Sequence, residues 1–179
     1  MDGGVGLLDV LDALPRQTTV LCDVATTLSD APGLYGPQKG ATPEQVVELE
    51  ARFRADERLV PFAQLPGSGA AGGLGAALAY LGAELVPGAA TVLDLVGFDP
   101  SRYDLVVTGE GRVDATTREG KVPFEVARRC AKAGARCVVF GGIVAEPLPG
   151  VETVALSGDP ARAAADLEEL GARLLDAAG

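Results

Sequence analysis

The pattern of hydrophobic and polar positions changes character about halfway along the chain. In the first part, a run of β-branched residues over 18–24 predicts a strand that carries an aspartate near its end. The segment Thr-Pro-Glu-Gln at 42–45 has the order of an N-cap, a first helical proline and a capping-box glutamine, and it predicts a helix to about Arg58. A glycine-rich turn and an alanine-rich stretch at 67–85 predict a second helix, and a short one follows Pro87.

From Tyr103 onward the pattern predicts strands that alternate with helices. An apolar strand ends in glycines, a helix stops at Gly134, and further strands and a terminal helix with Asp159 as its N-cap follow. Such alternation is typical of a parallel sheet that is covered by helices on both faces. Ligands then lie beyond the carboxyl ends of the strands.

A short polar link with Pro100 separates the two patterns. The length of 179 residues and the hydrophobic content of 47% are sufficient for one sizeable core or for two small lobes that share an interface. We therefore expect an α/β fold with residues 1–100 in one lobe and residues 101–179 in another.

The net charge of the chain limits the classes of partner that it can bind. The formal net charge of −10 argues against a nucleic-acid partner, because phosphate backbones require a concentrated basic surface. No apolar run approaches the roughly 20 residues of a membrane span, and the N-terminus lacks a basic region followed by an apolar stretch. We expect a cytoplasmic protein with small-molecule ligands and no membrane partner.

The chain has no histidine and three cysteines, which restricts the available chemistry. Cys22, Cys130 and Cys137 lack metal-ligand spacing and lie in apolar patterns, so we expect them to be buried small hydrophobic residues. Because histidine is lacking, catalysis by a Ser-His-Asp triad or a Cys-His pair is excluded. Carboxylates, lysines, hydroxyls and backbone amides remain, and this set suits phosphoryl transfer.

Three glycine-bearing loops concentrate the polar residues: 35–41, 66–75 and 108–121. Glycines allow backbone N–H groups to approach an anion closely, especially before a helix N-terminus. In the second loop the glycines could equally serve close helix packing. Lys39 in the first loop could meet a phosphate or a carboxylate, or it could simply be a solvated turn lysine.

The third loop brings the widest set of polar groups to the end of an apolar strand. Glu110 or Asp114 could bind Mg²⁺ through carboxylate oxygens, or accept a proton from an attacking hydroxyl. Lys121 could offset the charge of a phosphoryl group in transfer. The alternative is a surface loop with capping residues and an internal ion pair.

The segments GPQKGA, PGSGAAGGLG and TGEGRVDATTREGKVP, in this order, resemble those of the bacterial glycerate kinase family, of the glycerate 2-kinase type. The resemblance covers the chain from the strand at Cys22–Val24 to Phe140–Gly142. It implies a protein with a two-lobed α/β fold. Such a protein would use Mg²⁺ and transfer the γ-phosphoryl group of ATP to D-glycerate, which yields a phosphoglycerate. Residues 1–100 would then be part of a second, inserted α/β lobe, and residues 101–179 the C-terminal part of a Rossmann-like lobe.

The same resemblance implies roles for individual residues. Glu110, Asp114, Thr117 and Lys121 would occupy the matched positions of the third loop. From their type and location we expect Asp114, Glu110 and Lys121 to be catalytic, and Glu110 and Asp114 to bind Mg²⁺. The residues implied to bind the substrate or the nucleotide are Asp23, Gln38, Lys39, Gly67, Ser68, Gly69, Gly109 and Thr117.

The chain also departs from the family. It corresponds to the C-terminal half only, Ala25-Thr26-Thr27 stands where the family has Thr-Asn-Pro, and Thr116 replaces a glutamine. Three expectations therefore stay open. The chain is a kinase completed by a partner chain, a second copy or a compact rearrangement; it is a binding module without turnover; or it is a truncated product that dimerises.

Overall fold

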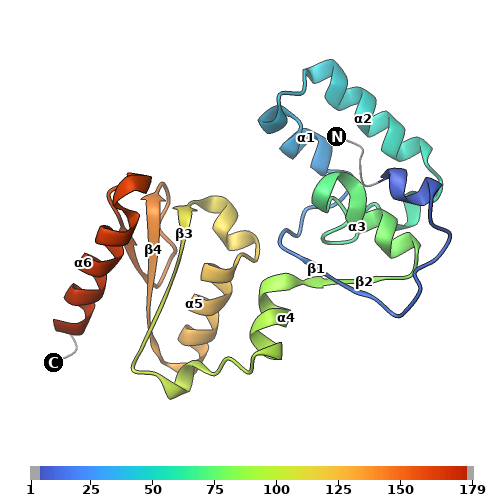
Figure 1. Ribbon diagram of the computed structural model, residues 1–179. Coiled ribbons are helices and arrows are strands. Elements are labelled where there is room, and N and C mark those ends of the chain that lie inside the picture. The colour runs from blue at the N-terminus through green and yellow to red at the C-terminus, as the bar shows by residue number, and fades with distance from the viewer. Residues whose placement is uncertain (1–4, 177–179) are drawn as a thin grey trace. The chain divides into compact units, whose positions relative to one another are not determined.

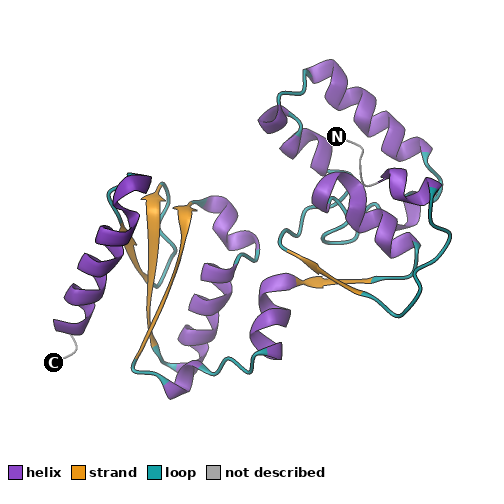
Figure 2. Cartoon of the chain, viewed as in Figure 1, coloured by secondary structure: helices purple, strands orange, loops and turns teal. Residues whose placement is uncertain are grey.

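The computed structural model describes residues 5–176, and the chain divides into two compact units, Met1–Val96 and Gly97–Gly179. Each unit combines helices with a parallel sheet of its own (Figures 1 and 2). The predicted α/β class is confirmed. The assignment of each unit to a particular lobe of a larger fold stays a prediction.

The first unit is built around a two-stranded parallel sheet. Strand β1 (Thr19–Cys22) pairs with β2 (Glu84–Pro87), so that Thr19 lies opposite Glu84. The helices are α1 (Ala31–Tyr35), α2 (Pro43–Ala55), α3 (Ala70–Tyr80) and α4 (Gly88–Leu95). A short 3₁₀ helix at Val5–Asp9 precedes β1, and two others, at Pro37–Lys39 and Val60–Phe62, lie before and after α2.

Helix α2 begins where the sequence predicts. The Gln45 N–H donates to the Thr42 hydroxyl at 3.3 Å, and the Thr42 N–H donates to the Gln45 side chain at 2.9 Å, which is a complete capping box. The helix then packs Phe53 into a core with Leu28 and Leu59. Because this core fixes α2 against the α1 and α3 region, it also fixes the loops between them.

Two predictions for this unit were wrong in detail. The second helix ends at Tyr80, and residues 84–87 form β2 where a helix was expected to continue to Leu85. The Glu84 N–H donates to the Thr18 carbonyl at 3.0 Å, so the strand is defined by a partner distant in sequence. In addition, α1 forms inside a segment that was expected to be loop.

The second unit contains a three-stranded parallel sheet in the order β3-β4-β5. Helices α5 and α6 cover opposite faces of it (Figure 1), as the sequence predicts. The elements are β3 (Leu105–Val113), α5 (Val122–Ala133), β4 (Arg136–Val144), β5 (Glu152–Ala155) and α6 (Ala163–Asp176). A 3₁₀ turn over Pro160–Arg162 precedes α6, and the Asp159 side chain accepts a hydrogen bond from the Ala161 N–H at its start.

Strand β3 is longer than predicted. Its expected glycine-rich exit at 109–111 stays in register with β4, with Gly109 opposite Phe140 and Glu110 opposite Gly141. The strand ends at Val113, and Asp114 is the N-cap of a 3₁₀ helix over Ala115–Glu119 in the segment that was expected to be a loop. The side chain of Glu110 is therefore presented from a strand.

The three cysteines are buried free thiols, which confirms the sequence-based interpretation. Cys22 closes β1, whereas Cys130 of α5 and Cys137 of β4 meet on one face of the second sheet. Burial raises the pKa of each thiol, that of Cys137 to about 12. Each is therefore protonated and poorly nucleophilic at neutral pH.

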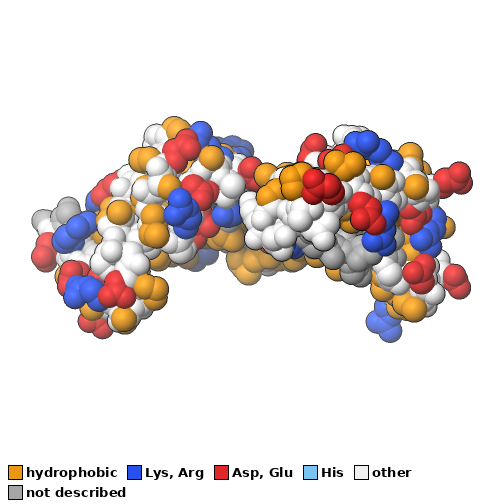
Figure 3. Space-filling view, turned by 90° about the horizontal axis from the view of Figure 1, so that it is seen from above, with side chains coloured by type: hydrophobic (Ala, Val, Ile, Leu, Met, Phe, Trp, Pro, Cys, Tyr) orange, Lys and Arg blue, Asp and Glu red, His pale blue; other side chains and the backbone are white. Residues whose placement is uncertain are grey.

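On the face seen in Figure 3, lysine and arginine side chains are scattered among acidic ones. They form no broad basic area there. The expected absence of a nucleic-acid partner stays a prediction. Within residues 5–176, no helix has the length and apolar character that crossing a bilayer requires.

Candidate functional site

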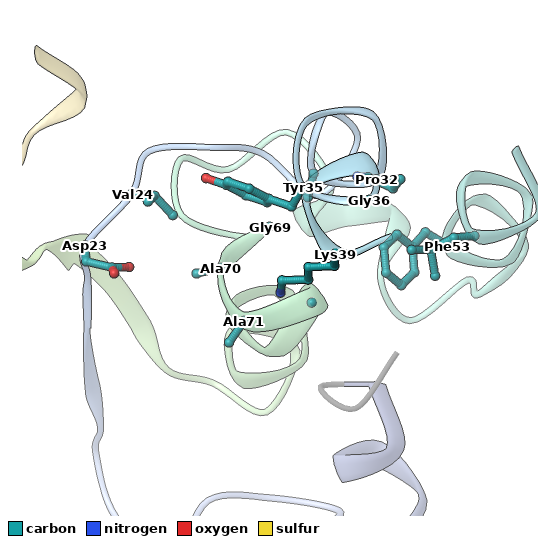
Figure 4. A pocket seen from close by; sticks show the side chains of 13 residues that line it. Asp23, Val24, Pro32, Tyr35, Gly36, Lys39, Phe53, Gly69, Ala70 and Ala71 are labelled. Atoms are coloured by element: carbon teal, nitrogen blue, oxygen red, sulfur yellow. The ribbon is translucent and has the colours of Figure 1, made fainter. Parts of the chain in front are cut away.

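The first unit contains a cavity of about 210 Å³ beside the glycine-rich loop (Figure 4). Three separate segments form most of its wall. These are the exit of β1 with Asp23, the α1 region and the turn after it with Tyr35 and Lys39, and the start of α3 at 69–72, while Phe53 of α2 contributes an apolar side. The structure thus brings Asp23, Lys39 and Gly69 of the predicted site to one cavity.

The start of α3 has an unusual backbone. Ala71, Gly72 and Gly73 have φ values of 50°, 67° and 89°, so three successive residues are left-handed. Ala71 is the one non-glycine residue among those described with a positive φ. This conformation costs a residue with a Cβ roughly 1–2 kcal/mol, and such strain tends to occur at functional sites. The sequence-based analysis missed this feature, although the adjacent glycines were a signal.

The other glycines of this loop are explained by close packing. A Cβ added at Gly69 would overlap the carbonyl oxygen of Thr27, and one at Gly75 would overlap that of Gly67. Gly67 has a φ of 85° and lies against the side chain of Cys22. The sequence left open whether these glycines serve anion binding or close packing. Packing accounts for all three, and Gly69 also lines the cavity.

Gly67, Ser68 and Gln38 do not line this cavity. Ser68 is fully buried, and its hydroxyl accepts a hydrogen bond of 2.7 Å from the Leu28 N–H. It therefore joins the glycine-rich loop to the segment before α1. Gln38 is exposed in the turn beside Lys39. Ligand binding by these three residues stays a prediction.

The charges in the cavity wall are Asp23 and Lys39. Both side chains are exposed, and within residues 5–176 neither has a hydrogen-bond or ion-pair partner. Tyr35, which sequence reasoning missed, shares a hydrogen bond of 2.7 Å with the Thr26 hydroxyl. The two charges are thus available to a ligand.

In the second unit, Thr117 organises the polar residues at the end of β3. Its side chain is fully buried, and its hydroxyl donates to Glu110 Oε1 at 2.5 Å and accepts from the Asp114 N–H at 3.0 Å. Lys121 Nζ donates to Glu110 Oε2 at 3.3 Å. Four residues of the predicted site are therefore in one hydrogen-bonded network.

The carboxylate of Asp114 is held by three donors. Oδ1 accepts from the Thr116 N–H at 3.0 Å and from the Thr116 hydroxyl at 2.7 Å, and Oδ2 accepts from Arg112 Nε at 3.2 Å. The Thr116 hydroxyl is the main reason why the pKa of Asp114 lies below its ordinary value of 3.8. Thr116 and Arg112 were not among the predicted site residues, and the structure places both at the site.

Gly109 has a packing role in this unit. A Cβ there would meet the Phe140 carbonyl oxygen at 2.5 Å and the Phe140 ring at 2.6 Å. The glycine thus lets two strands and an aromatic ring approach closely one residue before Glu110. Its direct contact with a ligand stays a prediction.

Glu110 and Asp114 have the donor chemistry for a hard cation such as Mg²⁺, which takes oxygen ligands and is often bound by one or two carboxylates together with substrate phosphates. The described residues contain no group of three or more carboxylate, thiol or imidazole ligands. Binding of Mg²⁺ by Glu110 and Asp114 stays a prediction.

Each unit combines a parallel sheet with helices and has polar, glycine-bearing segments near strand ends, so the protein is of the α/β class. The chain belongs to the glycerate kinase family, whose model matches residues 9–158.

Individual relatives agree with this assignment. Over 135 residues the chain is 41% identical to a glycerate kinase of Halalkalibacterium halodurans, covering 69% of this chain and 36% of the relative. Over 125 residues it is 41% identical to the glycerate 2-kinase of Escherichia coli, covering 63% and 33%. The crystal structure of a protein assigned as glycerate kinase 2 from Salmonella typhimurium LT2 aligns with a TM-score of 0.53 at 36% identity, over 78% of this chain and 40% of that one.

The matched region thus spans little more than a third of the length of these relatives. The glycerate kinase-like α/β fold, represented in part, is confirmed.

Proposed function

We propose that this chain performs a glycerate kinase reaction, the ATP-dependent phosphorylation of D-glycerate to a phosphoglycerate. The observation that carries the proposal is the network of Glu110, Thr117, Lys121 and Asp114 at the end of β3, in a chain of the glycerate kinase family. Phosphoryl transfer depends mainly on positioning and on electrostatic stabilisation. A network of charges fixed by a buried hydroxyl meets both needs.

In this proposal Lys121 stabilises negative charge on the phosphoryl group in transfer. Its ammonium is close enough to Glu110 to be held in place, and it keeps further N–H donors for a ligand oxygen. Glu110 and Asp114 would hold Mg²⁺, which supplies charge neutralisation for the phosphates when it is bound. Glu110 is the better candidate for proton transfer, because its carboxylate accepts two hydrogen bonds whereas that of Asp114 accepts three.

A coupled assay of ADP release with MgATP, in the presence and absence of D-glycerate, tests the proposal. The unaltered chain should release ADP in a glycerate-dependent manner. Glu110→Gln and Lys121→Met should each lower the rate by about 10²–10⁴-fold, the range for loss of an acid–base or electrostatic group.

Glu119→Gln is the matched control, since Glu119 is an exposed carboxylate of the same loop. It should retain the full rate. Glycerate-dependent ADP release that does not exceed background in the unaltered chain would contradict the proposal.

A second candidate is a relative that binds ligand without turnover. The feature that favours it is Thr116, which stands where the family has glutamine and whose side chain is used to hold Asp114. Binding of D-glycerate or ATP without ADP release would support this candidate. Completion of the fold by a second copy or by a partner chain stays a prediction, and size-exclusion chromatography of the assayed sample tests the first of these.

A further inference from the structure

Two buried thiols of the second unit, Cys130 and Cys137, have no role in the proposed phosphoryl transfer. Cys130 is fully buried in the last turn of α5, and Cys137 is 8% exposed near the start of β4. The two thiols interact with each other through a hydrogen bond. They therefore form a pair inside this unit.

The alternation of side chains along β4 explains why Cys137 faces α5. Val138 packs with Leu170 and Leu174 of α6 in the core of the unit. Successive side chains of a strand point to opposite faces of the sheet, and α5 and α6 cover opposite faces (Figure 1). The side chain of Cys137 therefore lies on the face that α5 covers.

The spacing of buried residues along α5 places Cys130 against the same face. Pro123, Val126, Ala127 and Cys130 are all buried, and they recur at separations of three and four residues, which puts them on one side of the helix. The helix packs on β3 and β4. The patterns of the helix and of the strand thus bring the two sulfur atoms together.

The turn between the two elements keeps the cysteines close along the chain as well. Gly134, with a φ of 70°, ends α5, and the Ala135 N–H donates to the Cys130 carbonyl at 3.0 Å. Strand β4 begins at Arg136, directly before Cys137. Because the two cysteines flank one short turn, the chain entropy lost when a bond closes the ring between them is small.

We propose that Cys130 and Cys137 are a site of reversible oxidation, at which a hydroperoxide such as hydrogen peroxide converts the two thiols to a disulfide. The proposal concerns a modification of the chain and does not depend on the proposed kinase activity. Cys22 is the single cysteine of the first unit, so it has no second thiol within that unit. It serves as the internal comparison.

The chemistry takes place in two steps. A thiolate of the pair attacks one peroxide oxygen, the O–O bond breaks, and a sulfenic acid forms, while the hydroxide that leaves takes up the proton lost by that thiol. The second sulfur then attacks the sulfenic sulfur, so that an S–S bond forms and the S–O bond breaks. The departing hydroxide takes up the second thiol's proton. The thiols lose two electrons, and the peroxide is reduced to two molecules of water.

Burial makes this reaction slow while the unit is closed. It raises the pKa of both thiols, so that little thiolate is present at neutral pH. The peroxide therefore reacts when α5 moves away from the sheet, and reclosure places the second sulfur beside the sulfenic acid. A neighbouring thiol captures a sulfenic acid before it is oxidised further to a sulfinic acid.

Peptide mapping of the full chain after treatment with hydrogen peroxide tests the proposal. The remaining thiols are alkylated in denaturant, and the chain is digested with trypsin without reductant. Trypsin cleaves after Lys132 and after Arg136, so the two cysteines fall into separate peptides that a disulfide would join. The expected product is this linked pair, lighter by two hydrogen atoms than the free peptides together and separated again by dithiothreitol. Cys22 should be recovered in its alkylated form.

Cys22→Ala is the matched control, and it should give the same linked peptides. Cys130→Ala and Cys137→Ala should each abolish them. In these two variants the peroxide should carry the remaining thiol to a sulfinic acid, because the thiol that would capture the sulfenic acid is missing. The map of the unaltered chain tests the proposal even where a variant does not fold.

Four results would overturn the proposal. In the first, both thiols of the pair stay reduced in peroxide. In the second, either thiol becomes a sulfinic acid in the unaltered chain while no linked peptides form. In the third, the main disulfide involves Cys22. In the fourth, the linked peptides occur only in a disulfide-joined dimer on a non-reducing gel.

Discussion

The two loops that contain the predicted site residues are shaped in different ways. The loop of the first unit, at 66–75, takes its form from backbone conformation and from glycines that permit close contact. The loop of the second unit, at 114–121, takes its form from side-chain hydrogen bonds around Thr117 and Asp114. We therefore expect that an added methyl group in the first loop lowers the stability of the protein strongly. Removal of single hydrogen-bonding groups in the second loop should lower the stability in smaller steps.

The largest effect is expected from Gly75→Ala. The new Cβ would overlap the Gly67 carbonyl oxygen and lie 3.0 Å from the Ser68 Cα, and these are backbone atoms that cannot rotate away. Overpacking of this kind costs about 3 kcal/mol or more when the backbone must move. Urea unfolding monitored by circular dichroism measures the loss.

Gly33→Ala is the matched control for this prediction. Gly33 lies in α1 of the same unit, and an added Cβ there meets nothing within 4 Å. Its stability should change by no more than about 1 kcal/mol. Equal stability of the two variants would refute the packing account of the first loop.

An intermediate effect is expected from Thr117→Val, which keeps the shape of the side chain and removes its hydroxyl. Glu110 loses a donor, and the Asp114 N–H loses its acceptor in a buried place. The expected cost is about 1–3 kcal/mol in unfolding free energy. The glycerate-dependent rate should fall as well, because Glu110 is no longer fixed.

Thr117→Ser keeps the hydroxyl and removes the methyl group, so it distinguishes the contributions of the two groups. It should retain most of the rate, since both hydrogen bonds can still form, while losing some stability through the missing methyl. If Thr117→Val kept the full rate and stability, the second loop would not depend on its side-chain network.

The smallest effect is a difference in pH response between the two loops. The Thr116 hydroxyl lowers the pKa of Asp114, so the bonded carboxylate contributes stability above its unfolded pKa and loses it as pH falls through the folded pKa. Acidification below pH 4 should therefore increase hydrogen exchange in the second loop earlier than in the first. Asp114→Asn should abolish the acid-induced difference; its persistence would show that another group causes it.

Local signals explain which parts of the fold were predictable. The capping box at Thr42 and Gln45 and the stop of α5 at Gly134, where φ is 70°, depend on residues adjacent in sequence. Strand β2 was missed because Glu84–Pro87 follow an alanine-rich helix, and only pairing with β1 makes them extended. Distant hydrogen bonds of this type leave no mark in the local sequence pattern.

The candidate site likewise has parts that the sequence could predict and parts that it could not. The sequence identified Glu110, Asp114, Thr117 and Lys121 as polar residues of one segment, and the structure joins them. It could not tell that Thr116 would support Asp114, since a side chain's partner depends on the exact turn. The left-handed Ala71 was missed because alanine by itself favours a right-handed helix, and the adjacent Gly72 and Gly73 were the local signal for another conformation.

The buried cysteines described above divide between the two units, and this distribution makes them natural reporters. Cys22 belongs to the first unit, whereas Cys130 and Cys137 belong to the second. A thiol reagent can reach each one only after its own unit opens, because burial both shields the sulfur and keeps it protonated. The rates at which the three thiols are labelled therefore record the opening of each unit separately, in the unsubstituted chain and without an engineered cysteine.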